Sequence, residues 1–331
     1  MLQRRHVILL LALAAITAAS FLISLGSGSI QVNPLTVLQQ LLGSEQGLER
    51  RVMLELRLPR TFAAFISGGL LALAGVLMQV LLRNPLADPY ILGISGGSAV
   101  AALAAILMGL SGIWISNAAF LGALASILIV FGMAWSSHWS STRLLLTGVV
   151  VSAGWGALIN ILLTTSANNS VYSMLFWLMG DLSQSSAGWP SLLVLIAGFV
   201  LMMLFATSLN VLARGELQAA ALGVDVPRLK LILYFSASVL TACAVTIAGS
   251  IGFVGLVIPH MLRLLGARDH RILIPASVLL GGSFLIIADS FARSVMSPLQ
   301  LPVGVVTAVI GVPAFLIILR RNARSIPEAS E

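Results

Sequence analysis

The sequence of 331 residues is 59% hydrophobic and only 9% charged, with a formal net charge of +7. An average soluble domain has about 25% charged residues, so a soluble fold could not bury this much apolar surface. The basic residues are scattered between apolar runs instead of forming one stripe, which argues against a nucleic-acid-binding protein. The composition therefore predicts a membrane protein, with room for about ten crossings of about 20 residues each.

Apolar stretches, taken in chain order, predict an all-α polytopic protein. Arg4 and Arg5 precede an uncharged run from Val7 to Leu25, which is long for a signal peptide and is interpreted as a first helix. The run from Phe253 to Leu265 is too short to cross a membrane and is expected to be a short helix buried among its neighbours. Helices are expected near residues 7–25, 61–82, 91–108, 114–135, 143–164, 191–209, 229–249, 272–291 and 303–320.

The basic residues also predict the orientation in the membrane. About ten crossings put both termini on one side, and loops rich in arginine and lysine face the cytoplasm. With the N-terminus inside, most arginines and the lysine fall on the cytoplasmic side, which favours an N-in, C-in topology. The outer exceptions are Arg50, Arg51, Arg57, Arg60 and Arg293.

Two segments that do not cross the membrane are expected to be helical. Residues 33–56 begin with Asn33 and Pro34, an N-cap and a first-turn proline, and should lie along the outer membrane surface. In the loop 210–228, the run from Glu216 to Leu222 is bracketed by glycines and is placed in the cytoplasm. The remaining chain shows no soluble domain, so residues 1–331 are interpreted as a single transmembrane domain.

Several kinds of chemistry lack the residues that they need. The only lysine, Lys230, is not part of a glycine-rich phosphate-binding loop, so this chain is not a P-loop ATPase. Ion-coupled transporters usually carry carboxylates at mid-membrane depth. Asp181 and Asp289 fall near helix ends, and Asp289 can pair with Arg293 one turn later. An ion-coupled secondary transporter therefore remains only the alternative, and a polytopic membrane enzyme is disfavoured because no catalytic set is visible.

No metal or cofactor site is expected. Cys243 is the single cysteine and lies inside an apolar run, which is typical of a small core residue. The four histidines, His6, His138, His260 and His270, have no second ligand at helical spacing. His260 is the best placed of them, and it is interpreted as a hydrogen-bonded structural residue in preference to a substrate contact.

A series of short motifs carries a resemblance to a known family. They are Arg57 to Thr61, Gly68-Gly69, Gly75, Met78-Gln79, Arg83 to Pro89, Leu92 to Gly97, Arg143 to Gly148, Trp177 to Gly180, Ala221 to Gly223, Gly249 to His260, Asp269 to Arg271, Ala288-Asp289, Leu301 to Val305 and Gly311 to Pro313. In this order they resemble the FecCD family of permeases, BtuC-like subunits of ATP-binding-cassette (ABC) importers for ferric siderophores, haem or cobalamin. The resemblance covers about residues 50–320.

That resemblance implies a BtuC-like permease fold and a set of partners. The expected partners are a second permease subunit, which forms a homodimer with this chain, two separate ABC ATPase subunits that bind ATP, and a periplasmic or lipid-anchored substrate-binding protein. The permease itself is expected to need no cofactor and to catalyse no bond chemistry. It should lie in the inner (cytoplasmic) membrane and carry one of these metal chelates inward.

Three groups of residues acquire expected roles from the family. The cytoplasmic gate is Asn84, Leu86, Ser141 and Thr142, for which plain turns are the alternative. The helix that couples the ATPase to the membrane is Glu216, Ala219, Ala220, Leu222 and Gly223, for which a solvated linker is the alternative. The arginines that dock the binding protein are Arg57, Arg60 and Arg293, for which an Asp289 pair and lipid anchoring are the alternatives.

The transport pathway should be wide, polar, largely uncharged and weakly binding, because tight binding would prevent release. Candidate lining residues are Thr147, Ser152, Asn160 and Met174.

Overall fold

The computed structural model describes residues 4–27, 48–134, 141–183 and 188–323, and the regular structure in these ranges is entirely helical. The all-α prediction is confirmed. The elements are α1 (Arg4–Gly26), α3 (Leu48–Arg51), η1 (Val52–Arg57, a π-helix), α4 (Leu58–Leu81), η2 (Pro89–Leu92), α5 (Ile94–Leu107), α6 (Ile113–Ala134), α7 (Ser141–Thr165), α8 (Asn168–Met179), α9 (Trp189–Leu204), α10 (Ala206–Leu212), α11 (Glu216–Ala221), α12 (Val226–Ala248), α13 (Val254–Leu264), α14 (His270–Ser294) and α15 (Val303–Ala323).

Among the described residues, six helices are long and apolar enough to cross a membrane, and a bent pair formed by α9 and α10 makes a seventh. The six are α1, the continuous helix from η1 through α4, α6, α7, α12 and α14. The helices α5 and α13, and residues 303–317 of α15, are apolar but shorter. The expected number of ten crossings therefore stays a prediction.

The core of the bundle is built around α4, whose apolar span is 94% buried. A Cβ atom at Gly68 would overlap the backbone carbonyl of Gly281 in α14, and one at Gly75 would overlap that of Gly255 in α13. Small residues let helices approach closely where lipid removes the hydrophobic driving force between them. Gly68 and Gly75 therefore let α4 pack closely against α14 and α13.

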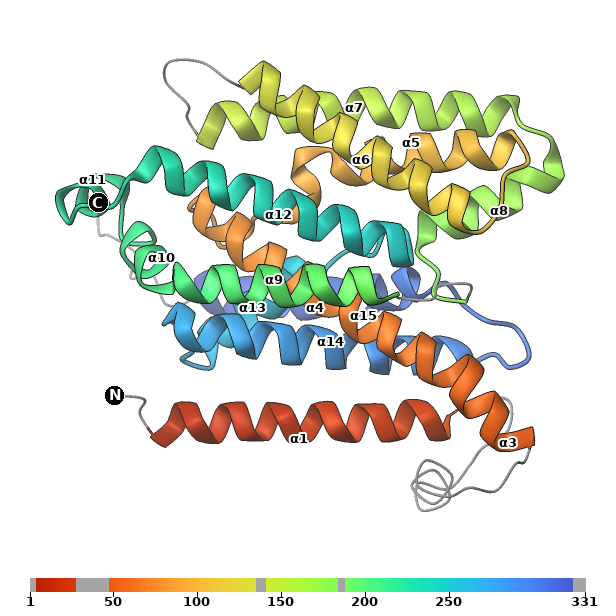
Figure 1. Cartoon of the computed structure of the whole chain (residues 1–331), viewed down its shortest axis with the longest axis horizontal. Coiled ribbons are helices and arrows are strands. Elements are labelled where there is room, and N and C mark those ends of the chain that lie inside the picture. The colour runs from red at the N-terminus through yellow and green to blue at the C-terminus, as the bar shows by residue number, and fades with distance from the viewer. Residues whose placement is uncertain (1–3, 28–47, 135–140, 184–187, 324–331) are drawn as a thin grey trace.

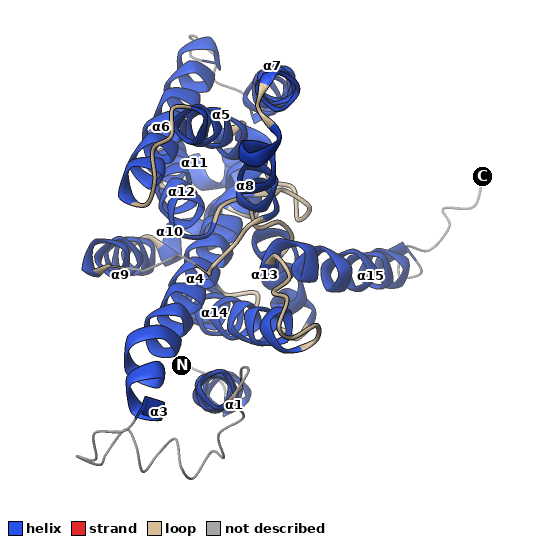
Figure 2. Cartoon of the chain, turned by 90° about the vertical axis from the view of Figure 1, so that its right-hand side faces the viewer, coloured by secondary structure: helices blue, strands red, loops and turns tan. Residues whose placement is uncertain are grey.

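A second group of helices uses the same device. A Cβ at Gly97 in α5 would overlap the carbonyl of Gly122 in α6, and one at Gly148 in α7 would overlap the carbonyl of Ile91 in η2. Figure 2 shows α5, α6 and α7 together on one side of the bundle, with α1 and α14 on the other. The glycines thus define two closely packed groups, one around α4 and one around α5.

The start of the α4 helix differs from the sequence-based expectation. Residues 33–47 of the predicted outer segment lie outside the described residues, but Leu48 onward is helical and continues through η1 into α4. The helix is longer than predicted because Leu25 and Met53 form a small buried apolar cluster that holds η1 against α1. Figure 1 shows α3 at the opposite end of the bundle from α11.

The helix expected near residues 191–209 is present but broken into α9 and α10. The chain breaks at Phe205, and α9 and α10 meet at a bend of 63°. Asn210 donates to the Asp269 carboxylate at 2.7 Å and accepts from the His270 backbone N–H at 2.9 Å. These bonds hold α10 against the start of α14, in a direction that a straight helix could not follow. The short buried helix expected after Phe253 is present as α13, with His260 buried.

Candidate functional site

Several of the motifs that carry the family resemblance meet in space. The Tyr90 hydroxyl accepts from the Ile251 backbone N–H at 3.1 Å, and the Ser95 hydroxyl donates to that of Ser250 at 2.9 Å. Gly180 has a positive φ of 78°, and the Asp181 N–H beside it donates to the Ala248 carbonyl at 2.9 Å. Motifs from three distant parts of the sequence therefore meet where η2, α5 and the residues after α8 contact the segment between α12 and α13.

The turn after α4 is held by Asn84. The Asn84 side-chain carbonyl accepts a hydrogen bond from the Leu86 backbone N–H at 2.9 Å. The Asn84 backbone carbonyl accepts a second one from the Ala87 backbone N–H at 3.0 Å. Arg83, just before it, has a positive φ of 50°. Asn84 thus satisfies two backbone N–H groups of the turn that follows α4, and Leu86 is left exposed at the surface.

Asp88 closes the same turn. Its carboxylate accepts from the Tyr90 backbone N–H at 2.8 Å as the N-cap of η2. Burial raises the pKa of Asp88 to about 6, and the hydrogen bond from Tyr90 opposes this rise. Asp88 therefore fixes the start of η2 at the end of this partly exposed turn.

The structure brings the second predicted gate segment to this turn. The Ser141 hydroxyl, at the start of α7, donates to the Leu81 carbonyl at the end of α4 at 3.0 Å. Thr142 is exposed, whereas Ser141 is partly buried. All four predicted gate residues therefore lie near the adjoining ends of α4 and α7, and the function of a gate stays a prediction.

The short helix α11 lies where the sequence predicts one. It begins after Gly215, at a φ of 140°, and ends before Gly223, at a φ of 81°. Ala219 is fully buried, whereas Ala220 is exposed. Leu217 and Leu222 leave 89% and 71% of their surface exposed. One face of α11 is thus packed on the protein, and the other presents apolar side chains without cover.

Lys230, which sequence reasoning did not include in this site, anchors α11. Its ammonium lies 2.6 Å from the Glu216 carboxylate, and its side chain is only 7% exposed. A lysine in the apolar pattern Leu229-Lys230-Leu231 needs a partner when it is buried, and this was the signal that could have found it. The pair fixes the first turn of α11 to the first turns of α12.

The predicted docking arginines are not exposed, as the sequence-based argument assumed. Arg57 and Arg293 are only 8% and 9% exposed. Arg57 donates to the Leu25 carbonyl at 2.7 Å. Arg293 donates to the Ser24 hydroxyl at 2.9 Å and lies 3.0 Å from the Asp289 carboxylate, which confirms the expected pair one turn apart.

Arg60 shares the same carboxylate. Its guanidinium contacts Asp289 at 2.8 Å and donates to the side chain of Gln300, at the surface, at 2.8 Å. Asp289 itself is completely buried. One carboxylate thus lies between two arginines. The sequence did not predict that these arginines are buried, because residues near 24, 60 and 290 come together only in the folded chain. The docking role of these arginines stays a prediction.

The predicted pathway residues do not share one environment. Asn160 on α7 is exposed, and Thr147 and Ser152 on the same helix are partly exposed. Met174 in α8 is fully buried and so contacts no open pathway in this structure. The apolar span of α7 is only 11% buried, which leaves most of this helix without protein cover in a single chain.

No metal site is assembled in the described part of the chain, where no three His, Cys, Asp or Glu side chains come together.

Asp269 caps the start of α14. Burial raises the pKa of its carboxyl, but hydrogen bonds from Asn210 and from the Arg271 backbone N–H, together with the charge of Arg271, outweigh that effect, so the pKa lies below its ordinary value. Asp269 therefore serves as an ionised N-cap, with its acceptor oxygen already in use.

The profile of the FecCD transport family matches residues 16–321. The chain belongs to the FecCD transport family. The cobalamin import system permease protein BtuC of Halobacterium salinarum is 43% identical over 278 residues, which cover 82% of this chain and 74% of that protein. The vitamin B12 import system permease protein BtuC of Vibrio vulnificus is 36% identical, over 96% of this chain and 95% of the relative.

An uncharacterized ABC transporter permease protein of Bacillus subtilis, YvrB, is 38% identical over 86% of this FecCD chain and 82% of its own length. Among solved structures, one described as an inward-facing conformation of a metal-chelate type ABC transporter superposes with a TM-score of 0.83 at 31% identity. The superposition covers 94% of this chain and 98% of the chain in that structure. The chain is thus an ABC importer permease of the FecCD type, a transport protein and not an enzyme.

Proposed function

We propose that this FecCD permease carries a corrinoid, the class of cobalamin, from an outer binding protein into the cytoplasm. The observation that supports this cargo is its likeness, over nearly the whole chain, to permeases named for cobalamin or vitamin B12 import. The helix α7 fits such a cargo because it is long, little buried, and carries hydroxyl and amide side chains with a single charged residue, Arg143. A bulky, weakly charged chelate passes most easily along a weakly binding surface.

Uptake by the assembled importer tests this cargo. Proteoliposomes that contain the permease with its ATPase and binding protein should accumulate labelled cobalamin when ATP is present, and not when the ATPase is inactive. Haem and a ferric siderophore, each offered with the same proteins, should give at least about tenfold less uptake. Equal or greater uptake of either iron chelate would show that cobalamin is not the cargo, while ATP-independent uptake driven by a proton gradient would favour the secondary transporter.

The proposed assembly is a pair of these permeases in the inner membrane with two ATPase subunits inside. The uncovered face of α7 supports a second permease, since an apolar helix with hydroxyl and glycine residues is suited to close contact within a membrane. The pair is a homodimer in the simplest form of this proposal. The chain itself needs no cofactor, because the partner ATPases bind the ATP.

Coupling to the ATPase is assigned to α11 in this proposal. The helix is fixed on the permease side by Glu216, Lys230 and Ala219, and it presents Leu217 and Leu222 outward. Exposed apolar side chains on a polar face of a membrane protein indicate a surface that a partner covers. The alternative of a solvated linker does not account for this amount of exposed leucine.

The gate is assigned to the adjoining ends of α4 and α7, which Ser141 and Leu81 connect. Thr142 is the better position for a cross-link because it is exposed, whereas the Ser141 hydroxyl is engaged within the chain. A Thr142→Cys permease pair should cross-link across the pathway to an extent that changes at least about threefold between the nucleotide-free and ATP-bound importer.

Cysteine cross-linking with a short bifunctional reagent, quantified on gels, measures this change. Replacing Ser116, which lies outside the predicted gate at the start of α6, with cysteine provides the control, since it should give the same low yield in both states. A Thr142→Cys yield that ignores nucleotide would contradict a moving gate at this position.

The docking of a binding protein on the outer end stays part of the proposal, but its test has to avoid the buried arginines. Reversing the charge of Arg57 or Arg60 would break contacts with Leu25 or Asp289, so a loss of transport would report misfolding as readily as lost docking. The dependence of docking affinity on salt is a cleaner measurement, because exposed charge pairs are screened over about 8 to 10 Å.

A further inference from the structure

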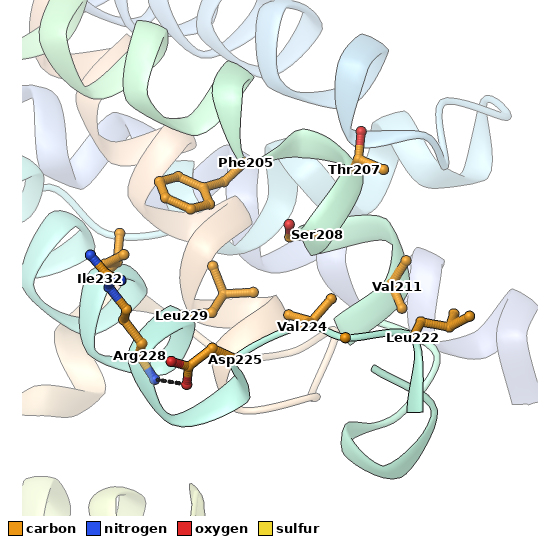
Figure 3. A pocket seen from close by; sticks show the side chains of 11 residues that line it. Phe205, Thr207, Ser208, Val211, Leu222, Val224, Asp225, Arg228, Leu229 and Ile232 are labelled. Atoms are coloured by element: carbon orange, nitrogen blue, oxygen red, sulfur yellow. Dashed lines mark hydrogen bonds between the residues drawn. The ribbon is translucent and has the colours of Figure 1, made fainter. Parts of the chain in front are cut away.

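A cavity lies beside the coupling helix, at the end of the bundle where α12 and α14 begin. It has a volume of about 610 Å³ and lies between α10, the segment after α11, and the first turns of α12. Figure 3 shows Phe205 and Leu229 on its walls, with Thr207 and Ser208 on the α10 side and Arg228 on the α12 side. The gate residues and the outer arginines do not line this cavity, and the coupling segment borders it only through Leu222 and Gly223.

The bend between α9 and α10 explains why the cavity exists. Farther along the membrane, α9 and α12 pack closely, because the Leu240 side chain would touch a Cβ at Gly198. At Phe205 the chain turns by 63° so that α10 can reach α14. The two helices therefore separate at this end, and the space between them is lined by Phe205, Val211, Leu229 and Ile232.

An apolar surface continues from the cavity along the helices. Leu204 and Leu201 on α9 are 77% and 38% exposed, and Phe235 on α12 is 37% exposed. These side chains belong to apolar helices that meet the criteria for a membrane crossing, α9 as part of the bent pair. The surface is thus suited to a hydrocarbon chain that runs from the cavity into the bilayer.

The polar end of the cavity carries two guanidinium groups. The exposed Arg228 lines it, and Arg271 reaches it by donating to the Thr207 hydroxyl at 2.9 Å. Two carboxylates lie beside them as helix caps: Asp225, in the lining, accepts from the Arg228 backbone N–H at 3.1 Å, and Asp269 accepts from the Arg271 backbone N–H at 2.9 Å. Their charges offset those of the two arginines, so a phosphate would be recognised here by the guanidinium N–H groups and by the N-termini of α12 and α14, and not by net charge.

We propose that this cavity binds one anionic phospholipid of the cytoplasmic leaflet, with its phosphate at Arg228 and Arg271 and an acyl chain along Phe205 and Leu229. Guanidinium groups bind phosphate oxygens through paired hydrogen bonds. The cytoplasmic leaflet supplies such lipids, and each basic residue near its surface contributes to their attraction. Because the cavity includes Leu222 and Gly223, which end α11, the lipid lies against the coupling segment and stabilises its position.

Lipid binding to the full-length permease tests this proposal. The purified protein in mild detergent is titrated with phosphatidylglycerol or phosphatidylcholine, and retained lipid is counted by native mass spectrometry. The permease should retain phosphatidylglycerol preferentially, and Arg228→Gln should weaken that binding about fivefold, the effect of one basic residue at a membrane surface. Ser208→Trp, which fills the cavity and keeps both arginines, should weaken binding of the same lipid.

The matched control is Arg268→Gln, an exposed arginine at the same end that does not line the cavity. It should retain phosphatidylglycerol as the unchanged protein does. Equal retention of the two lipids, or equal loss in Arg268→Gln and Arg228→Gln, would overturn the proposal. So would release of the lipid when the ATPase assembles, because the ATPase would then be the occupant. None of these measurements requires transport, so their failure would leave the proposed cargo untouched.

Discussion

Replacing Asp289 with asparagine is expected to destabilise the protein by about 3 to 5 kcal/mol, the effect of removing one partner from a buried ion pair. The asparagine keeps the shape of the side chain but removes the charge that Arg60 and Arg293 share. Both guanidinium groups would then be left in a region with little solvent, which is more costly than the loss of the contacts themselves. The free energy of unfolding, from titration with a denaturing detergent, measures the effect.

Asp181→Asn is the matched control, since this aspartate also lies near the end of a helix but bonds only locally, with the backbone N–H of Ser183. It should cost about 1 kcal/mol or less. Combining Asp289→Asn with Arg60→Gln should cost less than the sum of the two single changes, because the second removes a charge that the first leaves unpaired. A loss of under about 1 kcal/mol in Asp289→Asn would mean that the carboxylate does not hold the arginines.

Replacing Leu217 with aspartate is expected to weaken association with the ATPase by about thirtyfold or more. Burial of a leucine side chain contributes about 1.5 to 3 kcal/mol, and a charge in its place would be buried without a partner. Leu217 is 89% exposed and makes no contribution to the permease core, so insertion and stability should not change. Affinity for the ATPase, measured with the permease in nanodiscs, and ATP-driven uptake should fall together.

A leucine at the other end of the molecule provides the control for this change. Leu299 follows α14 and is 70% exposed, so Leu299→Asp introduces the same charge far from α11. It should leave the affinity for the ATPase within about twofold of the unchanged protein. Full affinity in Leu217→Asp would contradict the assignment of α11 as the coupling helix and would favour a solvated linker.

Those elements that depend on local signals could be predicted from the sequence. Glycines at 215 and 223 bracket α11, so this short helix could be predicted from the sequence. The same holds for the pair of Asp289 and Arg293, which are one turn apart on a single helix. In each case the interacting groups are separated by only a few residues. The helix expected near residues 91–108 begins later than predicted, because Gly93 in the left-handed region separates η2 from α5.

Features that depend on distant residues could not be predicted in this way. Arg57 donates to the Leu25 carbonyl, and Arg60 forms an ion pair with Asp289. No local sequence pattern distinguishes these arginines from exposed ones. The bend at Phe205 is also invisible in the apolar run, because Asp269 and His270 hold α10 from about 60 residues away. The sequence therefore suggested that these arginines lie near one another but did not predict their burial.

The two groups of helices packed through glycine have a consequence for alternating access. Where backbones touch, as at Gly68 with Gly281 and at Gly97 with Gly122, helices cannot slide without losing contact, so each group moves as a rigid block. Between the blocks lie side-chain hydrogen bonds, from Ser95 to Ser250, from Ser141 to the end of α4 and from Tyr234 of α12 to Ile127 of α6, together with buried apolar contacts. Such bonds can be exchanged for others at little cost, so the seam between the blocks is where the permease can open first to one side of the membrane and then to the other.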